Sequence, residues 1–209
     1  MSKIKFYKVN PPYGFFSKFS PHPIYIDGGM WLTVEHYFQA SKFEDINLKE
    51  KIRAIKSPMN AALEGRNKHN KIRDDWEVVK EQFMFDALKA KFLQHPKMRK
   101  ELLFTENSII IEHTNNDNYW GDGGNGEGKN RLGTLLMQVR DEIKSYSEDP
   151  FLVLPPWVGF PTISQYDMFW RMGLGEEYLT QWSKYYLATD TIIYRNKFPE
   201  TTNWEGIYD

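Results

Sequence analysis

Apolar and polar residues alternate over residues 3–8, a pattern that predicts a β-strand near the start of the chain. A second strand is expected over residues 23–26, and the sequence Asp27-Gly28-Gly29 after it is typical of a tight turn. Thr33 is a favourable N-cap, so a helix is expected over about residues 34–44.

The middle of the chain predicts further helices. Ser57-Pro58 combines an N-cap with a proline at the first helical position, and Gly65 is a typical stop. The longest helix is expected to start at Asp74 or Asp75 and to end at Pro96. Its apolar stripe is formed by Trp76, Val79, Phe83, Ala87 and Ala90.

Later elements settle the expected fold class. Residues 97–104 are expected to be helical and residues 108–112 to form an apolar strand. Residues 114–130 are expected to form a loop, and residues 131–146 have the pattern of an amphipathic helix. Strands and helices mix without regular βαβ alternation, so we expect a mainly helical α+β domain with a small β-sheet.

The composition changes near residue 150. A polar stretch and then Pro155-Pro156 mark a boundary, which predicts a domain over 1–149 and an extension over 150–209. The extension holds 14 of the 33 aromatic residues, including Trp157, Trp170, Trp182 and Trp204. Two interpretations stay open: these rings pack a small subdomain onto the main core, or they form a lid that contacts a substrate or protein partner.

Charge and residue usage exclude several classes of protein. The 27 basic and 28 acidic residues give a net charge of −1, which does not favour nucleic acid as a partner. The absence of cysteine excludes disulfide scaffolds, Cys-zinc sites and thiol nucleophiles. The N-terminus has no secretory signal and the apolar runs are too short to cross a membrane, so we expect a cytoplasmic protein.

A glycine-rich loop is the first candidate for chemistry. Five of the 14 glycines lie within residues 118–130. The match to a phosphate-binding P-loop fails because Asn130 stands where a Ser or Thr would hold magnesium, so we reject an NTPase. Trp120 offers a stacking surface for a ligand, and Asp122 beside it offers a charge or hydrogen bond.

The helix over residues 34–44 is the second candidate. Glu35, Gln39 and Lys42 are spaced i, i+4 and i+7 and therefore share one face. From the spacing alone, a solvated helix face is the favoured interpretation. The histidines lack metal-ligand spacing, so we expect no metal. The side chains that could meet a phosphate are those of Lys42, Arg66, Lys129 and Arg131.

Five segments in order resemble the NADAR family and its YbiA-like branch. They are FYKVNPPYGFFSKFS, WLTVEHYFQASKF, SPMNAALEGR, RDDWEVVKEQFMFDALKAKF and NDNYWGDGGNGEGKNRLGTLLMQVR. The resemblance covers residues 5–143 and leaves the extension outside it. It implies an N-glycosidase without metal or other cofactor, whose catalytic residues are Glu35, Trp120 and Asp122.

The resemblance also implies the substrate class. YbiA-like members hydrolyse the N-glycosidic bond of phosphoribosylated aminopyrimidine intermediates of riboflavin biosynthesis, while other members remove ADP-ribose from modified guanine in nucleotides or DNA. A carboxylate stabilises the oxocarbenium-like sugar or deprotonates water, and the sequence leaves open whether Glu35 or Asp122 activates the water. We assign the catalytic carboxylate to Glu35, and ribose binding or assistance to Asp122. Gln39 and Asn130 are expected to bind base or sugar, and Arg66, Lys129 and Arg131 the phosphate. A non-catalytic nucleotide-binding or interaction module is the remaining alternative.

Overall fold

Helices and two short β-sheets make up residues 2–209, which the computed structural model describes. In chain order the elements are β1 (Lys3–Phe6), η1 (Gly14–Phe16), β2 (Ile24–Ile26), β3 (Gly29–Trp31), α1 (Val34–Ala40), α2 (Ile46–Ala54), α3 (Pro58–Glu64), α4 (Trp76–Gln94), α5 (Pro96–Leu103), β4 (Ile109–Glu112), α6 (Arg131–Tyr146), α7 (Pro156–Gly159), η2 (Met168–Arg171), α8 (Gly173–Ala188), α9 (Thr191–Lys197) and η3 (Thr202–Trp204). The α+β fold class, mainly helical with little sheet, is confirmed.

Two of the predicted helix starts are confirmed by their caps. The hydroxyl of Thr33 accepts a hydrogen bond from the backbone N–H of His36 at 3.4 Å, and Ser57 caps α3 through the N–H of Asn60 at 3.4 Å. The first strand is shorter than expected, because the chain turns at Lys8, whose φ is +51°. The Thr33 cap fixes the first turn of α1, which contains Glu35.

Among the elements that were not predicted are β3, α2, α7 and α9. Asp27 and Gly28 have φ values of +51° and +72°, and they form the two-residue turn of the β2–β3 hairpin. The sequence Asp27-Gly28-Gly29 therefore joins two strands rather than ending one. The other sheet pairs β1 with β4 in parallel.

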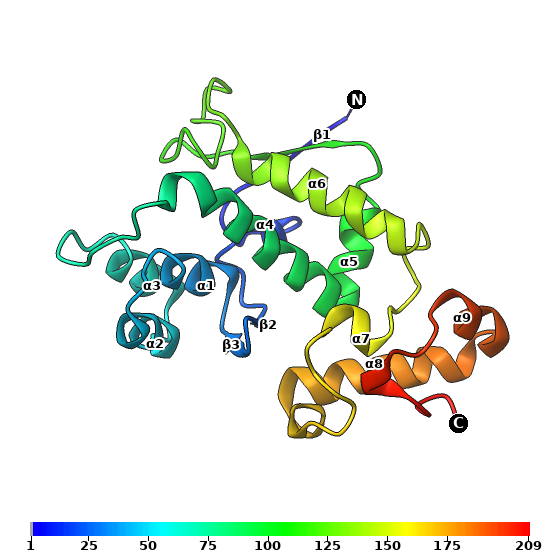
Figure 1. The fold of residues 1–209 in the computed structure, drawn as a ribbon. Coiled ribbons are helices and arrows are strands. Elements are labelled where there is room, and N and C mark those ends of the chain that lie inside the picture. The colour runs from blue at the N-terminus through cyan, green and yellow to red at the C-terminus, as the bar shows by residue number, and fades with distance from the viewer. Residues whose placement is uncertain (1) are drawn as a thin grey trace.

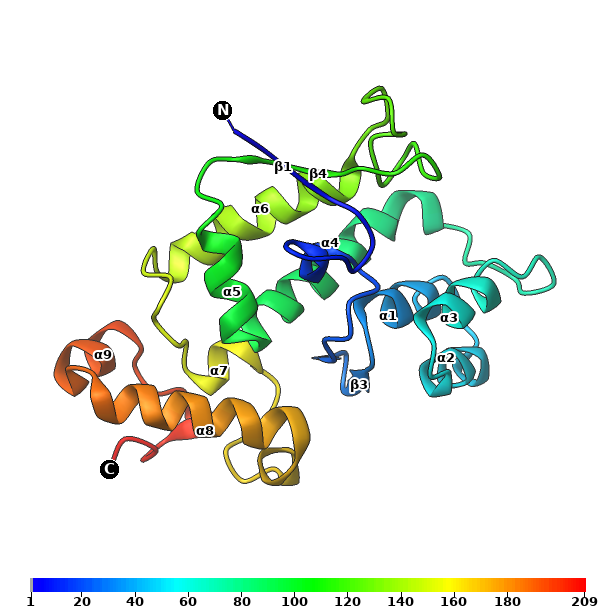
Figure 2. The ribbon, with the colours of Figure 1, turned by 180° about the vertical axis from the view of Figure 1, so that it is seen from behind.

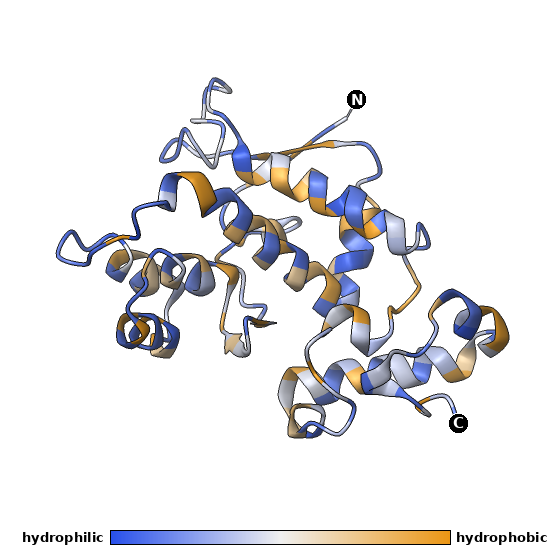
Figure 3. Ribbon diagram, viewed as in Figure 1, coloured by the Kyte–Doolittle hydropathy of each residue, from blue (hydrophilic) through white to orange (hydrophobic). Residues whose placement is uncertain are grey.

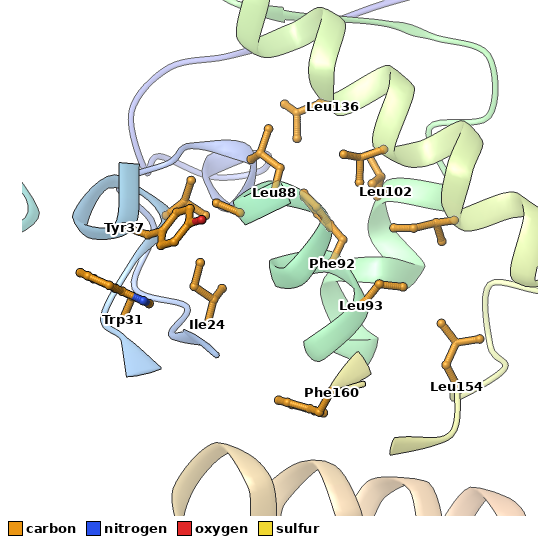
Figure 4. Close-up of a cluster of buried hydrophobic side chains, with 14 of the residues drawn as sticks. Ile24, Trp31, Tyr37, Leu88, Phe92, Leu93, Leu102, Leu136, Leu154 and Phe160 are labelled. Carbon is orange, nitrogen blue, oxygen red and sulfur yellow. The ribbon is translucent and has the colours of Figure 1, made fainter. Parts of the chain in front are cut away.

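Helix α4 lies at the centre of the molecule (Figure 1). It packs against α6 and α1, while α6 also packs on β4. The view from behind shows β1 and β4 running side by side along α6 (Figure 2). Apolar residues form stripes on the helices (Figure 3), and those that face inward include Leu88 and Phe92 of α4, Leu102 of α5 and Leu136 of α6 (Figure 4).

The C-terminal segment, residues 150–209, has its own aromatic cluster. Trp157, Trp170, Trp182 and Trp204 are all buried. The ring centroids of Trp157 and Trp204 lie 5.6 Å apart, and those of Trp170 and Trp204 lie 5.1 Å apart. The segment lies at the far end of the molecule from the glycine-rich loop in both views (Figures 1 and 2).

Arg99 of α5 anchors the chain that leads into this segment. Its buried guanidinium donates to the backbone carbonyls of Ser147, Asp149 and Leu152 at 3.0, 3.2 and 2.8 Å. These bonds fix residues 147–152 against the helix. The carbonyls of Ser147 and Leu152 accept from no other group within residues 2–209, whereas that of Asp149 also accepts from the N–H of Leu152 at 3.4 Å.

Arg99→Met should therefore lower the free energy of unfolding by about 3 kcal/mol, since buried acceptors left without donors are costly. Denaturant unfolding measures this change. Lys97→Met, at an exposed position two residues earlier in α5, is the control and should change stability by less than about 0.5 kcal/mol. An equal, small effect of both substitutions would show that Arg99 does not anchor the segment.

Candidate active site

The predicted shared face of α1 is buried, not solvated. Glu35 has no exposed surface and Gln39 retains only 2%. The Gln39 amide donates to Glu35 Oε1 over 2.6 Å. The solvated interpretation of this face is therefore wrong, and the i, i+4 pair forms part of the protein interior.

Lys18, in the loop after η1, supplies the counter-charge to Glu35. Its Nζ lies 3.2 Å from Glu35 Oε2, and its carbonyl accepts the backbone N–H of Glu35 at 3.0 Å. The same ammonium lies 5.3 Å from the ring centroid of Phe38 and 5.5 Å from that of Trp120. Lys18 thus joins Glu35 to Trp120, two residues 85 positions apart in the sequence.

Two oxygens of this cluster have no hydrogen-bond donor within residues 2–209, namely Glu35 Oε2 and Gln39 Oε1. Lys18 is close enough to Oε2 for an ion pair, but it is not aligned for a hydrogen bond. Gly65 abuts the Gln39 amide, where a Cβ would lie 2.1 Å from Oε1. Unsatisfied buried acceptors are rare in folded proteins. The two oxygens are therefore candidates to accept a hydrogen bond from a ligand hydroxyl or to bind a cation.

The helix expected over about residues 34–44 ends earlier, at Ala40, so Lys42 lies in the turn after α1 rather than on its face. Its Nζ donates to the carbonyl of Gly65 at 3.1 Å. Burial lowers the pKa of Lys42 to about 8, and although Glu35 opposes the shift, Lys18 and Arg66 add to it. The predicted residues Glu35, Gln39 and Lys42 are therefore brought together with Arg66 close by.

Trp120 lies in the loop between β4 and α6 and is 8% exposed. It packs edge-on against Phe38 of α1, with 5.3 Å between ring centroids. Asp117 Oδ1 accepts from the backbone N–H groups of Tyr119 and Trp120 at 2.9 and 2.8 Å, which fixes the turn that presents the indole.

Asp122 holds the glycine-rich loop in place. Its carboxylate accepts hydrogen bonds from His113 Nδ1 at 2.8 Å and from the backbone N–H groups of Thr114 at 3.2 Å and Gly124 at 2.9 Å. Burial alone would raise the pKa of Asp122, but these donors hold it below its usual value. The carboxylate oxygens are occupied by contacts within the loop.

The remaining predicted residues lie elsewhere. Asn130 spans back to β4, where its amide accepts from the N–H of Glu112 at 3.0 Å and donates to the carbonyl of Ile110 at 2.8 Å. Arg131 forms an ion pair with Glu81 of α4. The Lys129 side chain is exposed, with its ammonium 5.3 Å from the ring centroid of Tyr119.

A cavity of about 520 Å³ opens beside the Lys18–Glu35 pair. Its charged lining comes from Lys8, Lys18, Arg66, Glu112 and Asp117. Of the candidate site residues named from the sequence, Arg66 lines it. Glu35 and Trp120 do not line it but lie against Lys18, which does, and Asp122 accepts from the N–H of Thr114, which also does. No residue of 150–209 is part of this lining.

Sequence reasoning missed Lys18 and Glu112, which face the cavity. Glu112 ends the apolar strand Ile109–Ile110–Ile111, so a carboxylate at the end of such a run was an available signal. Within residues 2–209 there is no cluster of three potential metal ligands and no helix long and apolar enough to span a membrane.

Comparison with known proteins matches the NADAR domain to residues 5–144. N-glycosidase YbiA of Escherichia coli is 53% identical over 140 residues, which cover 67% of this chain and 88% of that protein. The NMR structure of the E. coli protein YbiA superposes with a TM-score of 0.67 at 50% identity, covering 71% of this chain and 88% of that one.

A relative from Vibrio vulnificus, named as a riboflavin biosynthesis protein, is 36% identical over 69% of this chain and 39% of its own length. The matched region contains the buried Lys18–Glu35 pair, Trp120 and the cavity beside them. On this evidence the chain belongs to the NADAR domain family.

Proposed function

We propose that this N-glycosidase hydrolyses the bond between ribose 5-phosphate and an aminopyrimidine base, as in intermediates of riboflavin biosynthesis. The observation that carries the proposal is the buried pair of Lys18 and Glu35, which lies beside Trp120 at the wall of the cavity. The relatives named as N-glycosidases and as riboflavin biosynthesis proteins support the reaction and the substrate class.

The charges at the cavity suit a sugar phosphate. Lys8 and Arg66 line it and present cations to a phosphate. In our proposal Lys18 exchanges its contact with Glu35 for the phosphate when substrate binds, because its long side chain can rotate. The Glu35 carboxylate then faces the ribose.

The reaction follows from that arrangement. As the C1′–N bond breaks, the ribose acquires oxocarbenium character, and the negative charge of Glu35 stabilises it in a water-poor site. Gln39 Oε1, which has no donor within residues 2–209, then accepts a hydrogen bond from a ribose hydroxyl in our proposal. Asp122 keeps the loop that carries Trp120 in place, so that the indole packs beside the departing base. In this proposal Asp122 acts through the loop rather than by direct contact with ribose.

The volume of the cavity favours a single phosphoribosyl unit over ADP-ribosylated guanosine, which has two nucleoside units and a diphosphate. A cavity of about 520 Å³ is in the size range for one small ligand.

The test incubates the protein with the aminopyrimidine ribosyl 5′-phosphate and, separately, with ADP-ribosylated guanosine. Chromatography measures the release of the base from the first compound and of ADP-ribose from the second. We expect kcat/KM for the first compound to exceed that for the second by at least roughly 10²-fold, the discrimination that misfit of a large group produces. The reverse preference would establish the de-ADP-ribosylating function instead. Cleavage of neither compound would favour a non-catalytic binding module.

A further inference from the structure

Glu112 is a carboxyl group that faces the cavity without a partner. Its side chain makes no hydrogen bond or ion pair within residues 2–209, although it is half-buried and lines the cavity with Lys18. A half-buried carboxyl without a fixed partner is available to a ligand, unlike Asp122, whose oxygens are all engaged.

The backbone of Glu112 is held on both sides. Its N–H donates to the Asn130 side chain at 3.0 Å, and its carbonyl accepts the N–H of Asp122 at 2.9 Å. It also pairs with Phe6 in the parallel sheet. These backbone contacts set the point from which the Glu112 side chain extends into the cavity, at the strand end where the loop that carries Trp120 begins.

We infer that Glu112 is the general acid that protonates the departing nitrogen, an inference that rests on the proposed function. An N-glycosidic nitrogen leaves poorly as an anion, so it needs a proton as the C1′–N bond breaks. The bond's electron pair goes to the nitrogen, which takes the proton from the Glu112 carboxyl. Water then bonds to C1′ and passes a proton to the Glu112 carboxylate, which restores the acid.

The electrostatic surroundings are consistent with this role. Burial raises the pKa of Glu112 to about 7; Lys18 opposes the shift, while Asp117, Glu35 and Asp122 add to it. A large share of the enzyme thus carries the proton near neutral pH.

Other charged groups on the elements around Glu112 have partners or lie apart. On β1, Lys5 registers opposite Ile111, and on α6 Arg131 pairs with Glu81. His113 next to it is bonded to Asp122. Across the cavity lie Lys8 and Arg66, which the proposed function assigns to the phosphate. Lys18 is the cation whose charge opposes the raised pKa of Glu112, so movement of Lys18 toward a phosphate would favour the protonated acid further.

The test compares Glu112→Gln with wild type on the aminopyrimidine ribosyl 5′-phosphate across a pH series. We expect kcat to fall roughly 10²-fold, the usual contribution of a general acid. Wild-type kcat/KM should fall roughly tenfold for each pH unit above the pKa of the acid, and this limb should vanish in the variant. Glu127→Gln removes an exposed carboxylate from the loop that follows β4; this control should retain the wild-type rate and pH limb.

A substrate with an acidic leaving group separates this role from a structural one. The 4-nitrophenyl riboside 5′-phosphate needs no proton at its leaving oxygen, so Glu112→Gln should cleave it within about threefold of the wild-type rate. An equal loss on both substrates would overturn the inference and indicate damage to the site.

Carbon-13 NMR titration of the Glu112 carboxyl, assigned with the Gln variant, needs no substrate. A titration near 7 is expected, and a midpoint below about 5 overturns the inference whatever the substrate proves to be. If wild type cleaves the nitrophenyl riboside but not the aminopyrimidine, the proposed substrate fails, and the NMR midpoint alone decides whether the acid role stands. If wild type cleaves neither, both proposals fail.

Discussion

Glu35→Gln is expected to lower kcat by at least about 10³-fold while changing KM by less than about tenfold, because the lost interaction forms mainly in the transition state. The amide keeps the shape of the side chain and can still accept the hydrogen bond from Gln39. It lacks the negative charge that faces the oxocarbenium-like ribose. Steady-state kinetics on the aminopyrimidine ribosyl 5′-phosphate measures both parameters.

The matched control is Glu77→Gln on the surface of α4. Glu77 pairs with Lys80 but is 79% exposed, so its loss should leave kcat within about twofold. Folding is checked by thermal unfolding, because the variant also leaves Lys18 without its counter-charge. A well-folded Glu35→Gln enzyme with kcat within tenfold of wild type would remove Glu35 from the catalytic residues.

Local sequence signals predicted the helices that carry the site. They failed for elements whose own residues show no clear pattern. Thr33 and Ser57 each capped a helix that formed as expected. Helix α2 was missed because its sequence has no apolar stripe: of its nine residues, Ile52 alone is buried. Strand β3 is three residues long and exists through its pairing with β2. The residues of α2 and of β3 therefore show no pattern from which either element could be predicted.

The candidate site divides in the same way. Glu35 and Gln39 share a helix face by spacing, which a sequence reveals. The burial of that face depends on Lys18, in a loop 17 positions earlier, and on Trp120, 85 positions later. Arg131 had the right charge for a phosphate, but α4 places Glu81 beside it. These contacts come from the packing of separate elements, which no local spacing encodes.

Lys18→Met is expected to lower the free energy of unfolding by about 3 kcal/mol or more and kcat/KM by roughly 10³-fold. Glu35 has no exposed surface, so removing its partner leaves a buried charge uncompensated. Methionine fills the space among Phe38 and Trp120 without the charge. The loss of activity should appear mainly in KM, because in our proposal Lys18 binds the phosphate.

The double variant Lys18→Met/Glu35→Gln separates stability from chemistry. With both charges removed, at least about 2 kcal/mol of the lost stability should return, because no unpaired charge remains buried. Activity should not return, because both functional groups are gone. Lys51→Met is the matched control: Lys51 is 60% exposed and pairs with Glu64 at 2.9 Å, so its loss should cost less than about 1 kcal/mol. If the double variant were no more stable than Lys18→Met, the two side chains would not be coupled. The proposed exchange of Lys18 between Glu35 and the phosphate would then be wrong, because it requires that pair.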